Sequence, residues 1–305
     1  MAAIHIRSND ALNINPPSGD EHLVVHGSDW LWAVTAIFIV SFLAVVAWTF
    51  FARAGEKVFH YIYTIGLLVG AVAYYAMASD LGYSVVTQAD QVGNGLTRQI
   101  FFAKYCFWVV EFPSVVLSLG LLSGVSWATI VYHIFLSWFW VVNYLLSAFT
   151  ATNYKWGFFA LGTVGYLLLA WGTLGSVALS SVRRFGVAGV TRDYLLLAGW
   201  TNLLWLLYPI AFGVGDGGNK IGVTESFIFY GILDVLLLPV VAFATLLLAR
   251  RWDYNQLNLV FTQYGRVPVA NGAFPEKAAP ANNTPLASAT PADNTPAVPE
   301  GVVTA

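Results

Sequence analysis

Five ionisable side chains lie in stretches that are otherwise apolar, and such side chains are where chemistry is first expected. They are Lys104, Glu111, His60, His133 and Asp234. Lys104 and Glu111 are seven residues apart, so on a helix they share one face and lie about 10 Å apart along the axis. We predict an ion pair between Lys104 and Asp234, either as a structural clamp or as part of a functional site. Glu111 is interpreted as a neutral carboxyl group or a proton carrier, and His60, near the edge of its segment, as solvated.

The composition indicates which elements must position these residues. Of the 305 residues, 58% are hydrophobic and only 10% are charged, whereas soluble domains have about 25% charged residues. A helix needs roughly 20 apolar residues to cross a bilayer. Such segments lack the alternation of barrel strands, so the prediction is an all-α bundle of seven transmembrane helices. The predicted spans are Trp30–Phe51, Val58–Ser79, Phe101–Leu122, Ser126–Ala148, Trp156–Val182, Tyr194–Val214 and Ser226–Ala249.

The loop cations predict the orientation of the bundle, because cytoplasmic loops are enriched in lysine and arginine. Alternation of the spans places seven cations on one side, which is therefore predicted to be cytoplasmic, with the N-terminus outside and the C-terminus cytoplasmic. These cations are Arg53, Lys57, Arg183, Arg184, Arg192, Arg250 and Arg251.

The predicted organisation has three parts: a polar extracellular segment (1–27), a seven-helix membrane domain (28–252) and a cytoplasmic tail (253–305). Seven of the twelve prolines fall within 265–305, and this composition predicts disorder from about residue 265. The bilayer is the expected partner, and the net charge of -2 argues against nucleic acid. No nucleophile–base pair or metal-ligand spacing indicates an enzyme.

Three motifs resemble those of the microbial (type I) rhodopsin superfamily. The stretch Lys104–Pro113 reads KYCFWVVEFP, where the family has Arg-Tyr-x-Asp-Trp-x-x-Thr-x-Pro. Trp205–Pro209 matches the family's Trp-x-x-Tyr-Pro. Asp234 begins the family's Asp-x-x-x-Lys, but Leu238 stands where the lysine that binds retinal is expected. The resemblance therefore implies the microbial rhodopsin fold with no covalent retinal cofactor, while noncovalent binding of retinal stays open.

The resemblance also implies which residues line a vestigial retinal pocket. The family's proton acceptor corresponds to Phe107 and its proton donor to Ser118, so a light-driven pump is disfavoured. Glu111, one turn further along, could be a relocated carboxylate. The implied pocket residues are Tyr74, Trp108, Glu111, Trp205, Tyr208, Phe212, Asp234 and Leu238.

Within this superfamily the chain is similar to fungal opsin-related proteins, through stretches such as Gly27–Trp32 and Tyr74–Ser79. That similarity implies a stress-related plasma-membrane protein with a structural, chaperone-like or regulatory role. Other plasma-membrane proteins or further copies of the chain are its implied partners. The alternative is a light-independent ion or proton transporter, or a protein that binds a hydrophobic ligand noncovalently in the vestigial pocket.

Overall fold

A computed structural model describes residues 9–53, 55–90, 96–175, 179, 189–257, 259–262 and 265–266. The chain divides into two units, Met1–Pro268 and Val269–Ala305. The second unit lies outside the described residues, and with it nearly all of the tail for which disorder is predicted. Arg183 and Arg184 also fall outside them.

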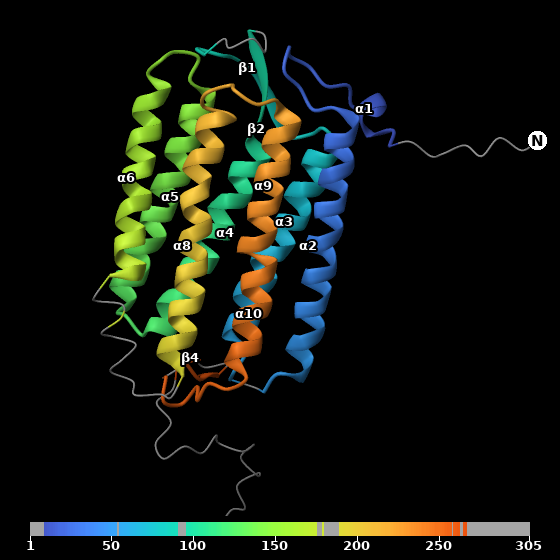
Figure 1. Cartoon of the computed structure of the whole chain (residues 1–305). Coiled ribbons are helices and arrows are strands. Elements are labelled where there is room, and N and C mark those ends of the chain that lie inside the picture. The colour runs from blue at the N-terminus through green and yellow to red at the C-terminus, as the bar shows by residue number, and fades with distance from the viewer. Residues whose placement is uncertain are drawn as a thin grey trace, which may run out of the picture. The chain divides into compact units, whose positions relative to one another are not determined.

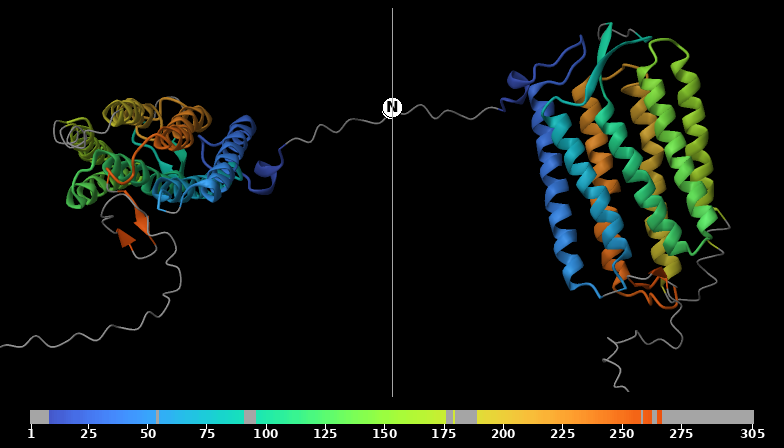
Figure 2. Two further views of the ribbon diagram at one scale, coloured as in Figure 1. Left: turned by 90° about the horizontal axis from the view of Figure 1, so that it is seen from below. Right: turned by 180° about the vertical axis from the view of Figure 1, so that it is seen from behind.

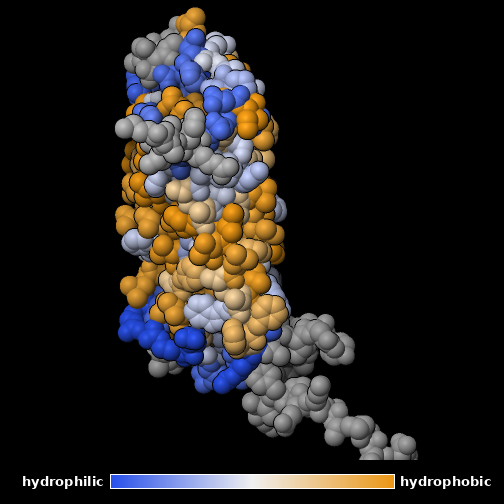
Figure 3. Space-filling model, turned by 90° about the vertical axis from the view of Figure 1, so that its right-hand side faces the viewer, coloured by the Kyte–Doolittle hydropathy of each residue, from blue (hydrophilic) through white to orange (hydrophobic). Residues whose placement is uncertain are grey.

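Long apolar helices that run side by side make up the first unit (Figures 1 and 2). Seven spans in the described part of the chain are long and apolar enough to cross a membrane, which confirms the predicted seven-helix bundle. Exposed apolar side chains form a hydrophobic band, and hydrophilic residues gather at both of its ends (Figure 3). The helices are α2 (Val25–Phe51), α3 (Val58–Ala78), α4 (Phe102–Ser123), α5 (Trp127–Phe149), α6 (Lys155–Leu174), α8 (Val190–Val214), α9 (Val223–Leu237) and α10 (Pro239–Ala249).

Two spans differ from the predicted boundaries in an informative way. The fifth was predicted to reach Val182, but α6 ends at Leu174, where Gly175 takes an extended conformation. The seventh span consists of two helices, because α9 ends at Leu237 and α10 begins at Pro239. Proline has no backbone N–H to continue the helical hydrogen bonds. Leu238, the position expected for a retinal lysine, lies at this break.

A tryptophan side chain supplies a hydrogen bond that proline removes from a helix. Pro113 in α4 has no N–H for the carbonyl oxygen of Val109, and the Trp138 indole of α5 donates to that oxygen at 2.9 Å. In the last turn of α9, the Trp200 indole of α8 donates to the carbonyl oxygen of Leu236 at 3.1 Å. Lipid cannot satisfy a backbone carbonyl, so the Trp138 bond compensates for Pro113 within the membrane.

Replacing Trp138 by phenylalanine is therefore expected to lower the free energy of unfolding by about 1–3 kcal/mol, because the Val109 carbonyl oxygen is left without a donor on an apolar surface that faces lipid or detergent. Thermal unfolding of the purified protein in detergent measures the effect. The matched control is Trp171→Phe, because the side chain of Trp171 is 81% exposed. Equal losses for both variants would contradict the role assigned to the Trp138 hydrogen bond.

One end of the bundle, the hairpin end, carries elements that the sequence did not predict. β1 (Tyr83–Thr87) pairs antiparallel with β2 (Thr97–Phe101), and Tyr83 lies opposite Phe101. The chain beside Glu21 joins the other edge of β2, since the Gln99 N–H donates to the Glu21 carbonyl oxygen at 2.9 Å. The short helix α1 (Ala11–Ile14) precedes this contact. The hairpin brings Arg98 and Gln99 over the ends of the helices.

The opposite end, the basic end, carries Arg53, Lys57, Arg192, Arg250 and Arg251 near helix termini. The chain after α10 packs against it: Trp252 and Tyr254 are buried and contact the ring of Phe59. The Trp252 indole donates to the carboxylate of Asp193 at 3.0 Å. Two short strands, β3 (Phe261–Thr262) and β4 (Gly265–Arg266), pair antiparallel beyond it.

Candidate functional site at the centre of the bundle

Asp234, in α9, is the centre of a hydrogen-bonded cluster that joins four helices. Its carboxylate is fully buried. It accepts hydrogen bonds from the Tyr74 hydroxyl of α3 at 2.5 Å and from the Trp108 indole of α4 at 3.1 Å. The Tyr208 hydroxyl of α8 donates to it at 2.6 Å. Three donors can stabilise a carboxylate within a low-dielectric interior. The protein itself therefore supplies the hydrogen bonds that the buried Asp234 carboxylate needs.

The predicted ion pair between Lys104 and Asp234 is wrong. The Lys104 ammonium group donates to Asp216 at 2.5 Å, and the Tyr105 hydroxyl donates to the same carboxylate oxygen at 2.7 Å. The guanidinium of Arg98 lies 3.8 Å from the other oxygen of Asp216. Asp216 follows α8, and the connection to α9 folds back over the end of α4. Lys104 therefore finds a nearer carboxylate than Asp234.

The charges around Asp216 keep it ionised. Burial acts to raise the pKa of Asp216, but the charges of Lys104 and Arg98 outweigh burial, and the pKa is held below its usual value. Arg98 also donates to the Asn219 side chain at 3.0 Å and to the carbonyl oxygen of Ile221 at 2.7 Å. This cluster ties the hairpin to the connection between α8 and α9.

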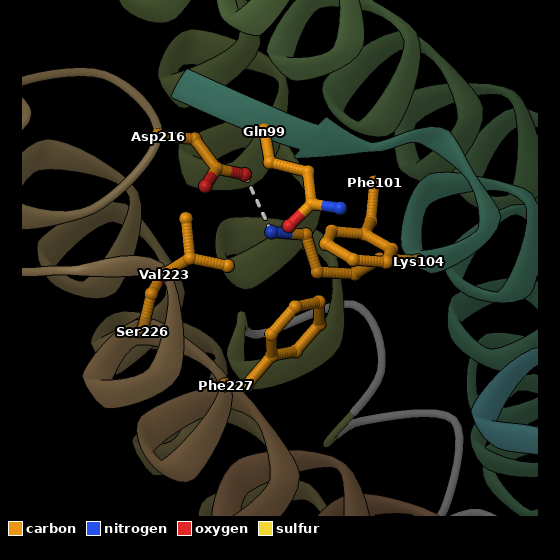
Figure 4. A pocket seen from close by; sticks show the side chains of 7 residues that line it. All are labelled: Gln99, Phe101, Lys104, Asp216, Val223, Ser226 and Phe227. Carbon is orange, nitrogen blue, oxygen red and sulfur yellow. Dashed lines mark hydrogen bonds and ion pairs between the residues drawn. The ribbon is translucent and has the colours of Figure 1, made fainter. Parts of the chain in front are cut away.

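A narrow pocket, too small to hold a water molecule, lies beside this cluster (Figure 4). The Lys104 side chain crosses it to reach Asp216, and the ring of Phe227 lies on the opposite wall. The pocket is therefore part of the hairpin-end ion cluster and separate from the Asp234 cluster. Its lining residues are Gln99, Phe101, Lys104, Asp216, Val223, Ser226 and Phe227.

Glu111 is fully buried in α4, and neither of its carboxyl oxygens has a hydrogen-bond partner among the described residues. Buried polar groups nearly always have partners, so this side chain is unusual. Its charge would act on Asp234, Tyr74 and Tyr208, which places the Glu111 carboxyl close to the Asp234 cluster.

Aromatic rings fill the space between the predicted pocket walls. The ring of Phe112 lies 5.9 Å from Trp108 and 5.9 Å from Trp205, measured between ring centroids. It also lies 5.0 Å from Tyr208 and 4.9 Å from Trp140. Phe112 was not among the predicted pocket residues, although its place between Trp108 and Pro113 was a signal for it. The two indoles thus have a side chain of the protein between them.

The predicted residue Phe212 lies apart from the Asp234 cluster. Its ring centroid is 4.6 Å from that of Tyr144 and 5.5 Å from that of Phe159. These contacts join α8 to α5 and α6 on one side of the bundle. Phe212 therefore packs between helices and does not contribute to the hydrogen bonds of Asp234.

A retinal Schiff base needs a primary amine, and the residues of this site do not provide one. Leu238 is fully buried, and a Cβ atom added to Gly66 of α3 would lie 3.1 Å from its side chain. Lys104 and Lys155 are buried at the hairpin end, where Lys155 donates to the Gln88 side chain at 3.1 Å. The site therefore does not fit a retinal held by a Schiff base. The other lysines are Lys57 and Lys220, near helix ends, and Lys277, outside the described residues.

Comparisons with known proteins agree with this fold. The model of the "Bacteriorhodopsin-like protein" family matches residues 27–253. Protein FDD123 of Trametes versicolor is 40% identical over 287 residues, which cover 92% of this chain and 95% of the relative. The 30 kDa heat shock protein of Saccharomyces cerevisiae is 32% identical over 256 residues, which cover 75% of each chain.

A solved structure gives the same result. The light-driven proton pump LR (Mac) of Leptosphaeria maculans has a TM-score of 0.71 and 30% sequence identity to the chain. The match covers 78% of this chain and 98% of the pump. The predicted resemblance to microbial rhodopsins is confirmed, and the chain belongs to the bacteriorhodopsin-like family.

Proposed function

We propose that the chain is an opsin-like membrane protein that forms no retinal Schiff base and has a structural, chaperone-like or regulatory role under stress in the plasma membrane. Leu238 carries this proposal, because a buried leucine stands where the family's motif has the reactive lysine. Phe112 supports it, since its ring lies between the indoles of Trp108 and Trp205. The proposal needs no ligand to satisfy Asp234, whose three donors are all supplied by the protein.

The stress-related part of the proposal has a separate support. One relative is named a heat shock protein, and the match covers 75% of its length. The pump LR (Mac) shares the fold at a similar identity, so the fold alone does not distinguish the two roles. Leu238 supports a role other than that of a light-driven pump, because only an amine can form the Schiff base.

Reconstitution with all-trans retinal tests the proposal. The purified protein is expected to show no absorption band in the visible range after washing, while LR (Mac) treated in parallel serves as the positive control. A band that survives washing and disappears with hydroxylamine would demonstrate a Schiff base and overturn the proposal. A band that washing removes would indicate noncovalent binding.

A second candidate function, light-independent proton or ion transport, is favoured by Glu111. A buried carboxyl group close to Asp234, with no hydrogen-bond partner in the described part of the chain, can bind and release a proton. If the chain transports protons, Glu111→Gln is expected to abolish the flux into liposomes along a pH gradient, because glutamine cannot carry an exchangeable acid proton. Asp253→Asn, an exposed carboxylate beyond α10, is the matched control. Equal fluxes for empty liposomes and protein-containing liposomes would exclude this candidate.

A further inference from the structure

Four side chains meet at the basic end, where α2 and α10 finish and α3 starts, and together they form the Trp48 corner. The guanidinium of Arg250 lies 5.1 Å from the centre of the Trp48 ring. The His60 ring lies 6.2 Å from the same indole at an interplanar angle of 76°. Lys57 precedes α3, and its charge acts on His60. Arg250 and His60 thus contact one tryptophan, and Lys57 lies near His60.

The cations of the Trp48 corner have no carboxylate of their own. Among the described residues, neither Lys57 nor Arg250 has a carboxylate oxygen within 4 Å, whereas the other cations of the basic end are paired. Those pairs are Arg53 with Glu56 at 3.7 Å, Arg192 with Asp193 at 3.3 Å and Arg251 with Asp193 at 3.9 Å. The positive charge of the corner is therefore available to an anion.

His60 packs against the same indole. The sequence predicted a solvated side chain, but His60 is only 6% exposed. The prediction was wrong because Trp48 and the neighbouring helices cover the ring. Its ring nitrogens are closed to the surroundings, and the Glu56 backbone interacts with the ring, so His60 supports the Trp48 indole and does not itself reach a ligand.

The surroundings of the corner indicate what carries the anion. Phe50 and Phe51, in the last turn of α2, are 80% and 86% exposed. They lie where the hydrophobic band meets the hydrophilic residues of the basic end, the level at which tryptophan is enriched in membrane proteins. A ligand at this level presents its phosphate to the corner and its acyl chains to the phenylalanines.

We propose that the Trp48 corner binds the phosphate group of an anionic phospholipid in the leaflet that surrounds the basic end. Lys57 and Arg250 supply the charge, and Trp48, packed against His60, holds the Arg250 guanidinium in place by its ring face. The site is independent of the Asp234 cluster and of any retinal chemistry. It is a lipid site of the protein's outer surface.

Binding of short-chain phosphatidylserine to the purified full-length protein in detergent tests this site. One cation near an anionic lipid contributes on the order of 1 kcal/mol, which corresponds to about fivefold in affinity. Arg250→Gln is expected to weaken binding about fivefold, and Lys57→Gln/Arg250→Gln roughly thirtyfold. Arg192→Gln is the matched control, because it removes one exposed charge from the same end, but from an arginine that already faces Asp193.

Two further arms identify the ligand. Short-chain phosphatidylcholine is expected to bind at least tenfold more weakly than phosphatidylserine, and inorganic phosphate is expected to show no saturable binding. If Arg250→Gln and Arg192→Gln weaken lipid binding equally, the effect comes from the general surface charge. That result would overturn the proposal of a specific site at the Trp48 corner. Tight binding of inorganic phosphate, or equal affinity for both lipids, would overturn the assignment to an anionic phospholipid.

Discussion

Replacing Asp234 by alanine is expected to lower the free energy of unfolding by on the order of 4 kcal/mol. The substitution removes the acceptor of three buried donors, those of Tyr74, Trp108 and Tyr208. Each buried donor without a partner costs about 1–3 kcal/mol, and no water or lipid group replaces the carboxylate at this depth. Unfolding of the purified protein by heat or by denaturing detergent measures the loss.

Two variants bracket this result. Asp234→Asn keeps one side-chain acceptor and is expected to lose about half as much stability as Asp234→Ala. Asp253→Ala is the surface control, because this exposed carboxylate accepts from the nearby backbone N–H groups of Asn255 and Gln256 and joins no helices. If the Asp234→Ala and Asp253→Ala variants have the same free energy of unfolding, the Asp234 cluster does not hold the four helices together.

The second large effect is expected at the hairpin end, where Lys104→Met breaks the buried ion pair with Asp216. Removing one partner of such a pair costs about 3–5 kcal/mol, because the other charge stays buried. Asp216→Asn is expected to cost a similar amount. The double variant is expected to be more stable than the sum of both losses allows, by about 2 kcal/mol, because neither position 104 nor position 216 then carries a charge. The charge of Arg98 stays, and the Asn219 side chain and the Ile221 carbonyl oxygen still accept its hydrogen bonds.

The exposed Lys220, in the connection that also contains Asp216, supplies the control Lys220→Met. The pKa of Asp216 is held below its usual value, so the ion pair stabilises the fold at neutral pH and is lost only as the pH falls through that lowered pKa. The stability that the ion pair contributes to the unmodified protein is therefore expected to be the same at pH 6 and pH 8. Additive losses for the two single variants would show that Lys104 and Asp216 act independently.

The sequence predicted the bundle and several of the residues around Asp234, because both depend on local patterns. Seven apolar segments are visible in composition alone, and the family motifs identified Trp108, Tyr208 and Asp234 as neighbours. The structure brings these three together with Tyr74 around one carboxylate. What the cluster does stays a prediction, since its geometry is compatible with a purely structural role.

The partner of Lys104 could not be predicted in the same way. The prediction compared how deep Lys104 and Asp234 lie along their helices, and this comparison placed them near each other. Asp216 lies outside the spans, and its position depends on how the connection between α8 and α9 folds. The strands β1 and β2 were missed for a related reason. Five-residue strands are short, and β2 is stabilised by the distant chain beside Glu21.

The hydrogen bond from Trp138 to the Val109 carbonyl oxygen has an evolutionary consequence. Pro113 creates the need for that donor, so selection on Trp138 lasts only as long as the proline does. Descendants that lose Pro113 become free to drift at position 138. Descendants that keep it are expected to retain tryptophan there, and the two positions should change together among homologues.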